Sequence, residues 1–135
     1  GIVLMTAVLL SCSLYGLVHS ANPIASLLSS CFIVLFCYLL IYGYVSTVHL
    51  WLSIGLHAGW NFFQATIFGF AASGHSEART VLTHDSSSAD WLSGGDFGPE
   101  GSVLTIPVVL IALAVMRTWS RLGVPRERAV MQPRP

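Results

Sequence analysis

Two pairs of polar residues interrupt an otherwise apolar sequence, each with a spacing of four residues. The segment "YGLVH" carries Tyr15 and His19, and the segment "HAGWN" carries His57 and Asn61. Because an α-helix turns once in about 3.6 residues, each pair shares one face of a helix. A neutral histidine can act as a general base or a hydrogen-bond donor, and an asparagine amide can donate to a developing oxyanion. Such groups are suited to base catalysis and to stabilising an oxyanion, whereas hydrolysis also needs a group that activates water, and no carboxylate occurs in the first three predicted helices.

The sequence around these pairs is typical of a membrane protein. Charged residues make up 9% of the 135 residues, the mean hydropathy is +0.73, and no Asp, Glu, Lys or Arg occurs between Gly1 and Ser76. A water-facing surface of that length needs charges, so we expect these residues to lie in lipid or against other apolar helices. A net charge of zero and the absence of lysine argue against a nucleic-acid surface. The three cysteines, which we expect to be apolar packing residues, are Cys12, Cys31 and Cys37.

Turn residues divide the chain into the helices that must position the polar pairs. About 20 apolar residues are needed to cross a bilayer, and Asn22-Pro23 and Gly43 mark turns. The sequence predicts an all-α, polytopic transmembrane bundle with helices at about 2–20, 23–42, 47–72 and 102–122. These elements form one domain, 1–122, with a polar exposed loop at 74–101. The Pro/Arg-rich segment 123–135 is expected to be a disordered cytoplasmic tail.

The distribution of charge predicts the orientation of the bundle. Five of the six arginines lie at or beyond the end of the fourth helix, whereas the loop 74–101 is acidic. The positive-inside rule therefore places the C-terminus in the cytoplasm and the loop outside.

Polar groups within a membrane usually face a bundle interior or a water-filled cavity. At 100° per residue, Gln64 falls close to His57 and Asn61 and extends a polar stripe along the third helix. Gly55 and Gly59 form a G-x-x-x-G pair on the opposite face, which favours close packing and a central position for this helix. A single polar residue such as Gln64 or His49 can equally serve only to form a hydrogen bond between helices.

These motifs resemble those of the CAAX-protease and bacteriocin-processing family of intramembrane endopeptidases. The family carries E-E-x-x-x-R, F-x-x-x-H and H-x-x-x-N on separate helices. "YGLVH" is similar to the second motif, with Tyr15 in place of phenylalanine, and "HAGWN" matches the third. The segments "LVHSANP", "SIGLHAGWNFFQATIFG" and "GGDFGPEGS" are also similar to bacterial members, so the resemblance covers roughly residues 13–110.

The resemblance implies an activity and a role for each residue. His19 would help a glutamate of the first motif to activate water, while His57 and Asn61 would bind the scissile carbonyl and stabilise its oxyanion. Tyr15, Asn22 and Gln64 would support this set. The family has been described as metallopeptidases, so zinc held by His19 and His57 is an alternative to glutamate-activated water, although two histidines and an asparagine match a closed zinc site poorly.

The first motif is absent from the sequence, because the fourteen residues before Tyr15 contain no Glu or Arg. We therefore expect the C-terminal portion of such an enzyme, inactive without preceding helices of the same protein, with membrane lipid and a prenylated or signal-type peptide as partners. The alternatives are a non-catalytic membrane scaffold or bacteriocin-immunity-type protein with the same fold, and a transporter or proton path that uses the histidines. Asp96 and Glu100 form a rival candidate site as ligands, although Glu100 also suits a helix start.

Overall fold

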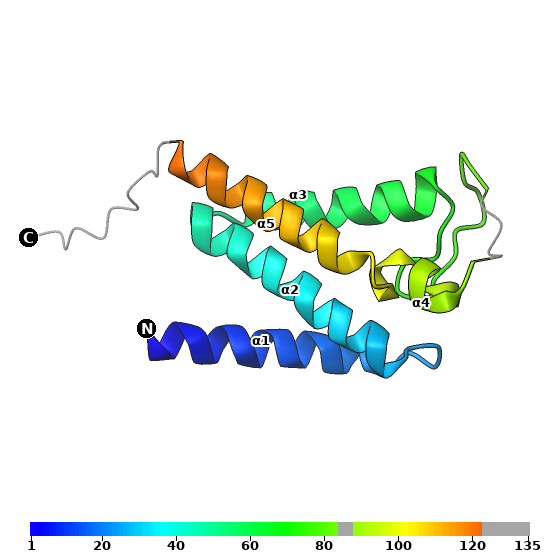
Figure 1. Ribbon diagram of the computed structural model, residues 1–135, viewed down its shortest axis with the longest axis horizontal. Coiled ribbons are helices and arrows are strands. Elements are labelled where there is room, and N and C mark those ends of the chain that lie inside the picture. The colour runs from blue at the N-terminus through cyan, green and yellow to red at the C-terminus, as the bar shows by residue number, and fades with distance from the viewer. Residues whose placement is uncertain (84–87, 123–135) are drawn as a thin grey trace, which may run out of the picture.

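The computed structural model describes residues 1–83 and 88–122, and these residues are mostly helical (Figure 1). Helices account for 72% of the structure, and no strand forms within the described residues. The first half contains α1 (Ile2–Ser20), α2 (Leu27–Thr47) and α3 (Leu50–Asn61), which continues into the π-helical turn η1 (Phe62–Ile67). The second half contains α4 (Asp90–Ser93), the 3₁₀ turns η2 (Gly95–Phe97) and η3 (Pro99–Gly101), and α5 (Thr105–Arg121). The segment expected to be a cytoplasmic tail, 123–135, lies outside the described residues.

The helix α2 is the central element, since α1, α3 and α5 all pack against it (Figure 1). Phe36 and Leu39 of α2 form a buried cluster with Val109 and Met116 of α5, and α3 adds partly buried side chains to it. The expectation that the helix with the G-x-x-x-G pair is central is therefore wrong for the described residues. The helix α2 is apolar around its whole circumference and can bury several faces at once, whereas α3 has no fully buried residue.

The first predicted helix matches α1, but the second lies four to five residues further along the chain than expected. Ser26 and Ser29 form a reciprocal capping box, in which each side chain accepts a hydrogen bond from the backbone N–H of the other, so α2 begins at Leu27 rather than at Pro23. Gly43 does not end the helix. It is buried inside α2, where an added Cβ would lie 3.3 Å from the Ser53 hydroxyl, so its small size permits close packing with α3.

The third predicted helix, 47–72, is shorter in the structure. Val48 adopts a left-handed conformation (φ 61°) between α2 and α3, and Gly69 (φ 72°) follows the end of η1. The fourth predicted helix, 102–122, corresponds to α5. The hydroxyl groups of Ser102 and Thr105 donate to the Pro99 carbonyl and close the turn that precedes this helix.

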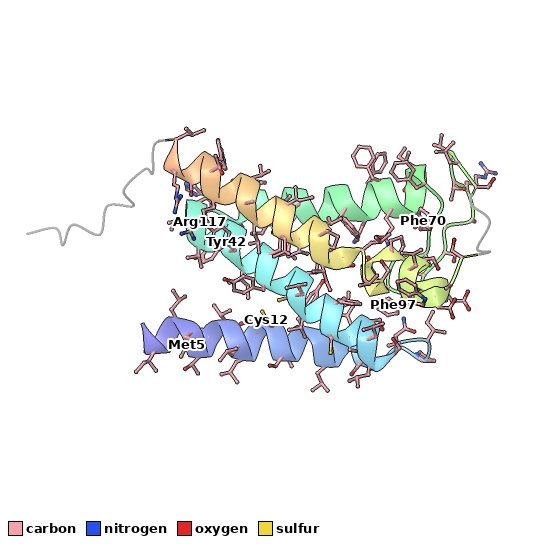
Figure 2. The ribbon with its side chains drawn as sticks, in the orientation of Figure 1. Met5, Cys12, Tyr42, Phe70, Phe97 and Arg117 are labelled. Atoms are coloured by element: carbon pink, nitrogen blue, oxygen red, sulfur yellow. The ribbon has the colours of Figure 1, made fainter. Side chains whose placement is uncertain are left out.

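Two helices, α1 and α2, are long and apolar enough to cross a membrane. At 1.5 Å per residue, the 19 residues of α1 extend about 28 Å, close to the roughly 30 Å hydrocarbon core of a bilayer. Figure 2 shows Cys12 on the side of α1 that faces α2, and Cys12 is buried there. Ile2, Val3 and Leu17 are 79%, 84% and 68% exposed, and such an apolar surface is suited to lipid.

Gly98, in the loop before α5, is predicted to be difficult to replace. Its backbone (φ 106°, ψ 167°) lies in a region open only to glycine, and an added Cβ would meet the Ala71 carbonyl oxygen at 1.9 Å. Gly98→Ala should lower the free energy of unfolding by at least about 1–3 kcal/mol, measured by detergent-induced unfolding. The control is Gly55→Ala, at a helical position with no atom within 4 Å of the new Cβ. Equal stability of the two variants would contradict the prediction.

Candidate active site

The structure brings both candidate histidines to the same tyrosine. The ring centroid of Tyr15 lies 4.4 Å from that of His19 on the same helix and 6.5 Å from that of His57 on α3. His57 also contacts Phe36 of α2 edge to face, at 6.1 Å. Three helices therefore fix the His57 ring, and Tyr15 is the residue that links the two motifs.

The hydrogen bond made by His19 determines which nitrogen is a base. Its Nδ1 lies 2.8 Å from the carbonyl oxygen of Tyr15. A carbonyl can only accept, so Nδ1 carries the proton and the neutral ring presents Nε2 as an acceptor. The sequence spacing placed His19 and Tyr15 on one face, and this contact additionally selects the tautomer that a general base requires.

Gln64 does not continue the polar stripe predicted from His57 and Asn61, which lie four residues apart within α3. His57 is half-buried, Asn61 is exposed and Gln64 is 5% exposed. The reason is that the helix changes at Phe62 from α to π geometry, whose i→i+5 bonding rotates Gln64 out of the α-helical register. The Gln64 amide instead donates to the Ala71 carbonyl. Among the described residues, Asn61 has no hydrogen-bond partner for its side chain, so its amide is available to a ligand.

An open cavity of about 450 Å³ lies beside His19 at the end of α1. His19 and Asn22 line one side, and Ser73, Gly74 and His75 line the other. The Asn22 amide donates to the Ser73 carbonyl at 2.7 Å and so joins the turn after α1 to the loop after η1. Asn22 and His75 both lie in the wall of this cavity, although the sequence predicted His75 to be only a loop residue.

Glu100 is the functional candidate whose place the sequence did not reveal. Its side chain is 4% exposed and accepts hydrogen bonds from the Trp60 indole and from the Ser73 backbone and hydroxyl. It therefore does not cap a helix, which is the role that the Gly-Pro turn favours. The α5 helix begins further along the chain, at Thr105, without a side-chain cap. The lone acidic residue in "FGPEGS", set among apolar and small residues, is the sequence signal for its burial.

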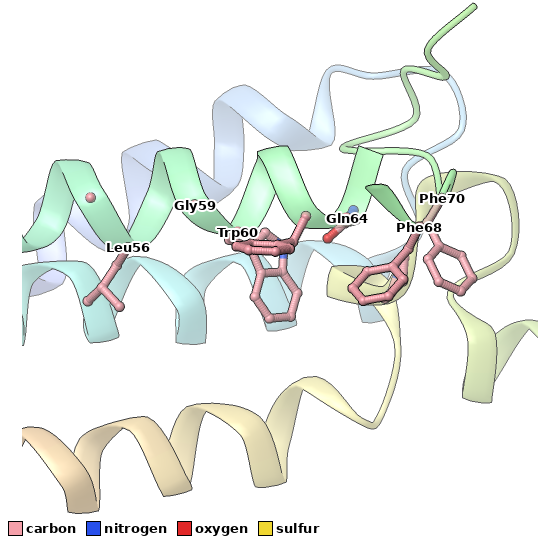
Figure 3. Close-up of a pocket in the computed structure, with 9 residues that line it drawn as sticks. Leu56, Gly59, Trp60, Gln64, Phe68 and Phe70 are labelled. Atoms are coloured by element: carbon pink, nitrogen blue, oxygen red, sulfur yellow. The ribbon is translucent and has the colours of Figure 1, made fainter. Parts of the chain in front are cut away.

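The G-x-x-x-G face of α3 borders a second, apolar cavity instead of a neighbouring helix. Gly55 is exposed, and a Cβ added at Gly55 or Gly59 would meet no atom within 4 Å. The cavity holds about 500 Å³ and is lined by aromatic side chains of α3, of η1 and of the segment that follows η1, together with Leu56, Gln64 and Pro99. Figure 3 shows Leu56, Trp60 and Phe68 pointing to this side of α3. The predicted close packing at these glycines is therefore not formed within the described residues.

Comparisons with known proteins provide no relative. No protein-family model, no curated protein and no solved structure matches the chain. The resemblance to the endopeptidase family thus stays a prediction from the motifs, and the function has to be inferred from the geometry of this chain.

The residues of the candidate site fit a zinc ion poorly. Within residues 1–83 and 88–122, no three His, Cys, Asp or Glu side chains gather into a ligand group. A catalytic zinc site usually needs three protein ligands, so no chemical step is assigned to a metal.

Proposed function

We propose that the chain is the C-terminal portion of an intramembrane endopeptidase similar to the CAAX-protease and bacteriocin-processing enzymes. The observation that carries the proposal is the contact of Tyr15 with both His19 and His57, because it joins two motifs that lie on separate helices. In the proposed arrangement α1, α2, α3 with η1, and α5 are the four spans of one bundle. The substrate class is a membrane-associated peptide, either prenylated or of the signal type.

In this proposal, each polar residue has one task in hydrolysis. His57 and Asn61 donate to the scissile carbonyl and stabilise the oxyanion that forms when water adds to the carbonyl carbon. Nε2 of His19 takes part in removing the proton from that water, together with a glutamate from a preceding helix of the same protein. When the C–N bond breaks, the proton passes to the leaving amine and the new carboxyl group takes the oxygen of the water.

The test is hydrolysis by the purified full-length protein in lipid vesicles. Two substrates are incubated with the protein in ¹⁸O-labelled water: a farnesylated peptide ending in a C-a-a-X sequence and a signal-type peptide. The masses of the products are measured by mass spectrometry. We expect one new peptide carboxyl group containing ¹⁸O. The His57→Ala protein, purified in parallel, controls for a contaminating peptidase.

The same experiment addresses a non-catalytic role. A membrane scaffold or immunity-type protein would leave both peptides intact, and so would a transporter. Absence of cleavage by folded wild-type protein would therefore contradict the proposal, whereas cleavage dependent on His57 would support it.

A further inference from the structure

Glu100 is a buried carboxylate whose hydrogen-bond donors are uncharged. Its Oε2 accepts from the Trp60 indole Nε1 at 3.1 Å, and its Oε1 accepts from the Ser73 hydroxyl at 2.7 Å and from the Ser73 backbone N–H. Burying a carboxylate is unfavourable unless such bonds replace its lost water. A neutral apolar residue would fill the position with a smaller free-energy cost of burial, so the presence of two hydrogen-bonded carboxylate oxygens needs an explanation.

Oε2 of Glu100 is connected to His57 through the rings of Trp60 and Phe36. Trp60 lies one helical turn after His57, and its ring contacts Phe36 at 5.4 Å between centroids. Phe36 in turn contacts the His57 ring at 6.1 Å. Fixing the indole N–H therefore restricts the ring of Trp60, which packs against the same phenylalanine as the histidine.

Oε1 of Glu100 is connected through Ser73 to the cavity beside His19. Ser73 lines that cavity and adopts a left-handed backbone conformation (φ 46°), which is uncommon for a residue with a side chain. Its carbonyl oxygen accepts from Asn22 at 2.7 Å, and Asn22 lines the same cavity as His19. The two bonds from Ser73 to Oε1 thus hold the wall that faces the end of α1.

We propose that Glu100 is a positioning residue, which sets the placement of His57 relative to the His19 cavity by binding Trp60 with one oxygen and Ser73 with the other. The inference rests on the proposed function, because it assumes that these two histidines share a task. In this proposal Glu100 acts through Trp60 and Ser73 and is assigned no role in proton transfer.

The test is Glu100→Gln in the full-length protein. Glutamine keeps the volume and one acceptor for Ser73, but its amide NH₂ cannot accept from the indole of Trp60. We expect kcat to fall by about 100-fold, as for a misplacement of about 1 Å, with KM little changed. The matched control is Glu77→Gln, which alters an exposed carboxylate in the same loop and should leave kcat unchanged.

Trp60→Phe tests the link to the histidine and replaces Glu100→Gln if that variant fails to fold. Both changes break the same hydrogen bond, from the Trp60 indole to Glu100. The double variant should therefore lose no more activity than the single variant with the larger loss. Additive losses would overturn the proposal. Trp51→Phe, at an indole that is 80% exposed, is the control for the loss of a tryptophan.

A spectroscopic measurement separates this inference from the proposed function. In ¹⁵N-labelled protein, Glu100→Gln should shift both the Trp60 indole signal and the His57 ring signals, which the Trp60→Phe and His57→Ala variants assign. These shifts would support the positioning role even if the wild type cleaves no peptide. Unchanged His57 signals would overturn the positioning role. This holds even if kcat falls, because the fall would then come from lower stability and not from a displaced His57.

Discussion

Replacement of His57 by alanine is expected to lower kcat for peptide cleavage by about 100–1000-fold and to leave KM nearly unchanged. The reason is that a donor to the oxyanion acts mainly in the transition state, when charge develops on the carbonyl oxygen. Initial rates at several peptide concentrations, measured in vesicles with the full-length protein, separate kcat from KM. The matched control is His49→Ala, which removes an exposed histidine at the start of the same helix and should have no effect.

Asn61→Ala should cause a loss of similar size, because Asn61 follows His57 by one turn and has a free amide among the described residues. The double variant should lose less than the product of the two single losses, since residues that serve one oxyanion act as a unit. A change in KM with constant kcat would contradict this role, as it would indicate equal binding of ground state and transition state.

The fold could be predicted where a local signal is strong. Pro23 and the apolar run before it located α1, and the apolar run after the acidic loop located α5. The start of α2 was predicted too early because the capping serines lie beyond the proline, and its end was missed because Gly43 serves packing with α3 rather than a turn. The position of α2 at the centre is a tertiary property, and three helices of comparable hydropathy do not reveal which one the others surround.

The candidate site could be predicted in part. Helical spacing correctly placed Tyr15 and His19 on one face, whereas the contact between Tyr15 and His57 was not predicted, because it depends on how separate helices pack. The place of Gln64 was predicted wrongly, because no feature of "NFFQAT" marks the change to π-helical geometry. Ser73, Trp60 and Glu100 were missed as a set because they are far apart in the sequence, and only the folded loop brings them together.

The tautomer of His19 leads to the second large effect. With its Nδ1 proton donated to the Tyr15 carbonyl, the ring can use only Nε2 as a base, and loss of such a group usually lowers a rate by about 10²–10⁴-fold. His19→Ala should show a loss in this range in kcat, measured as for His57, whereas His49→Ala, at an exposed histidine outside the cavity, should not.

Added imidazole distinguishes a chemical role of His19 from a structural one. The cavity of about 450 Å³ beside the position has room for a small base once the side chain is removed. Imidazole in the assay should therefore restore part of the activity of His19→Ala, and the restored rate should depend on the concentration of the neutral base. It should restore His57→Ala to a smaller extent, because the His57 ring packs against Tyr15 and Phe36. If His19→Ala kept wild-type kcat, the proton-transfer role would be wrong. If its lost activity returned only with conditions that restabilise the fold, His19 would instead act by packing against Tyr15.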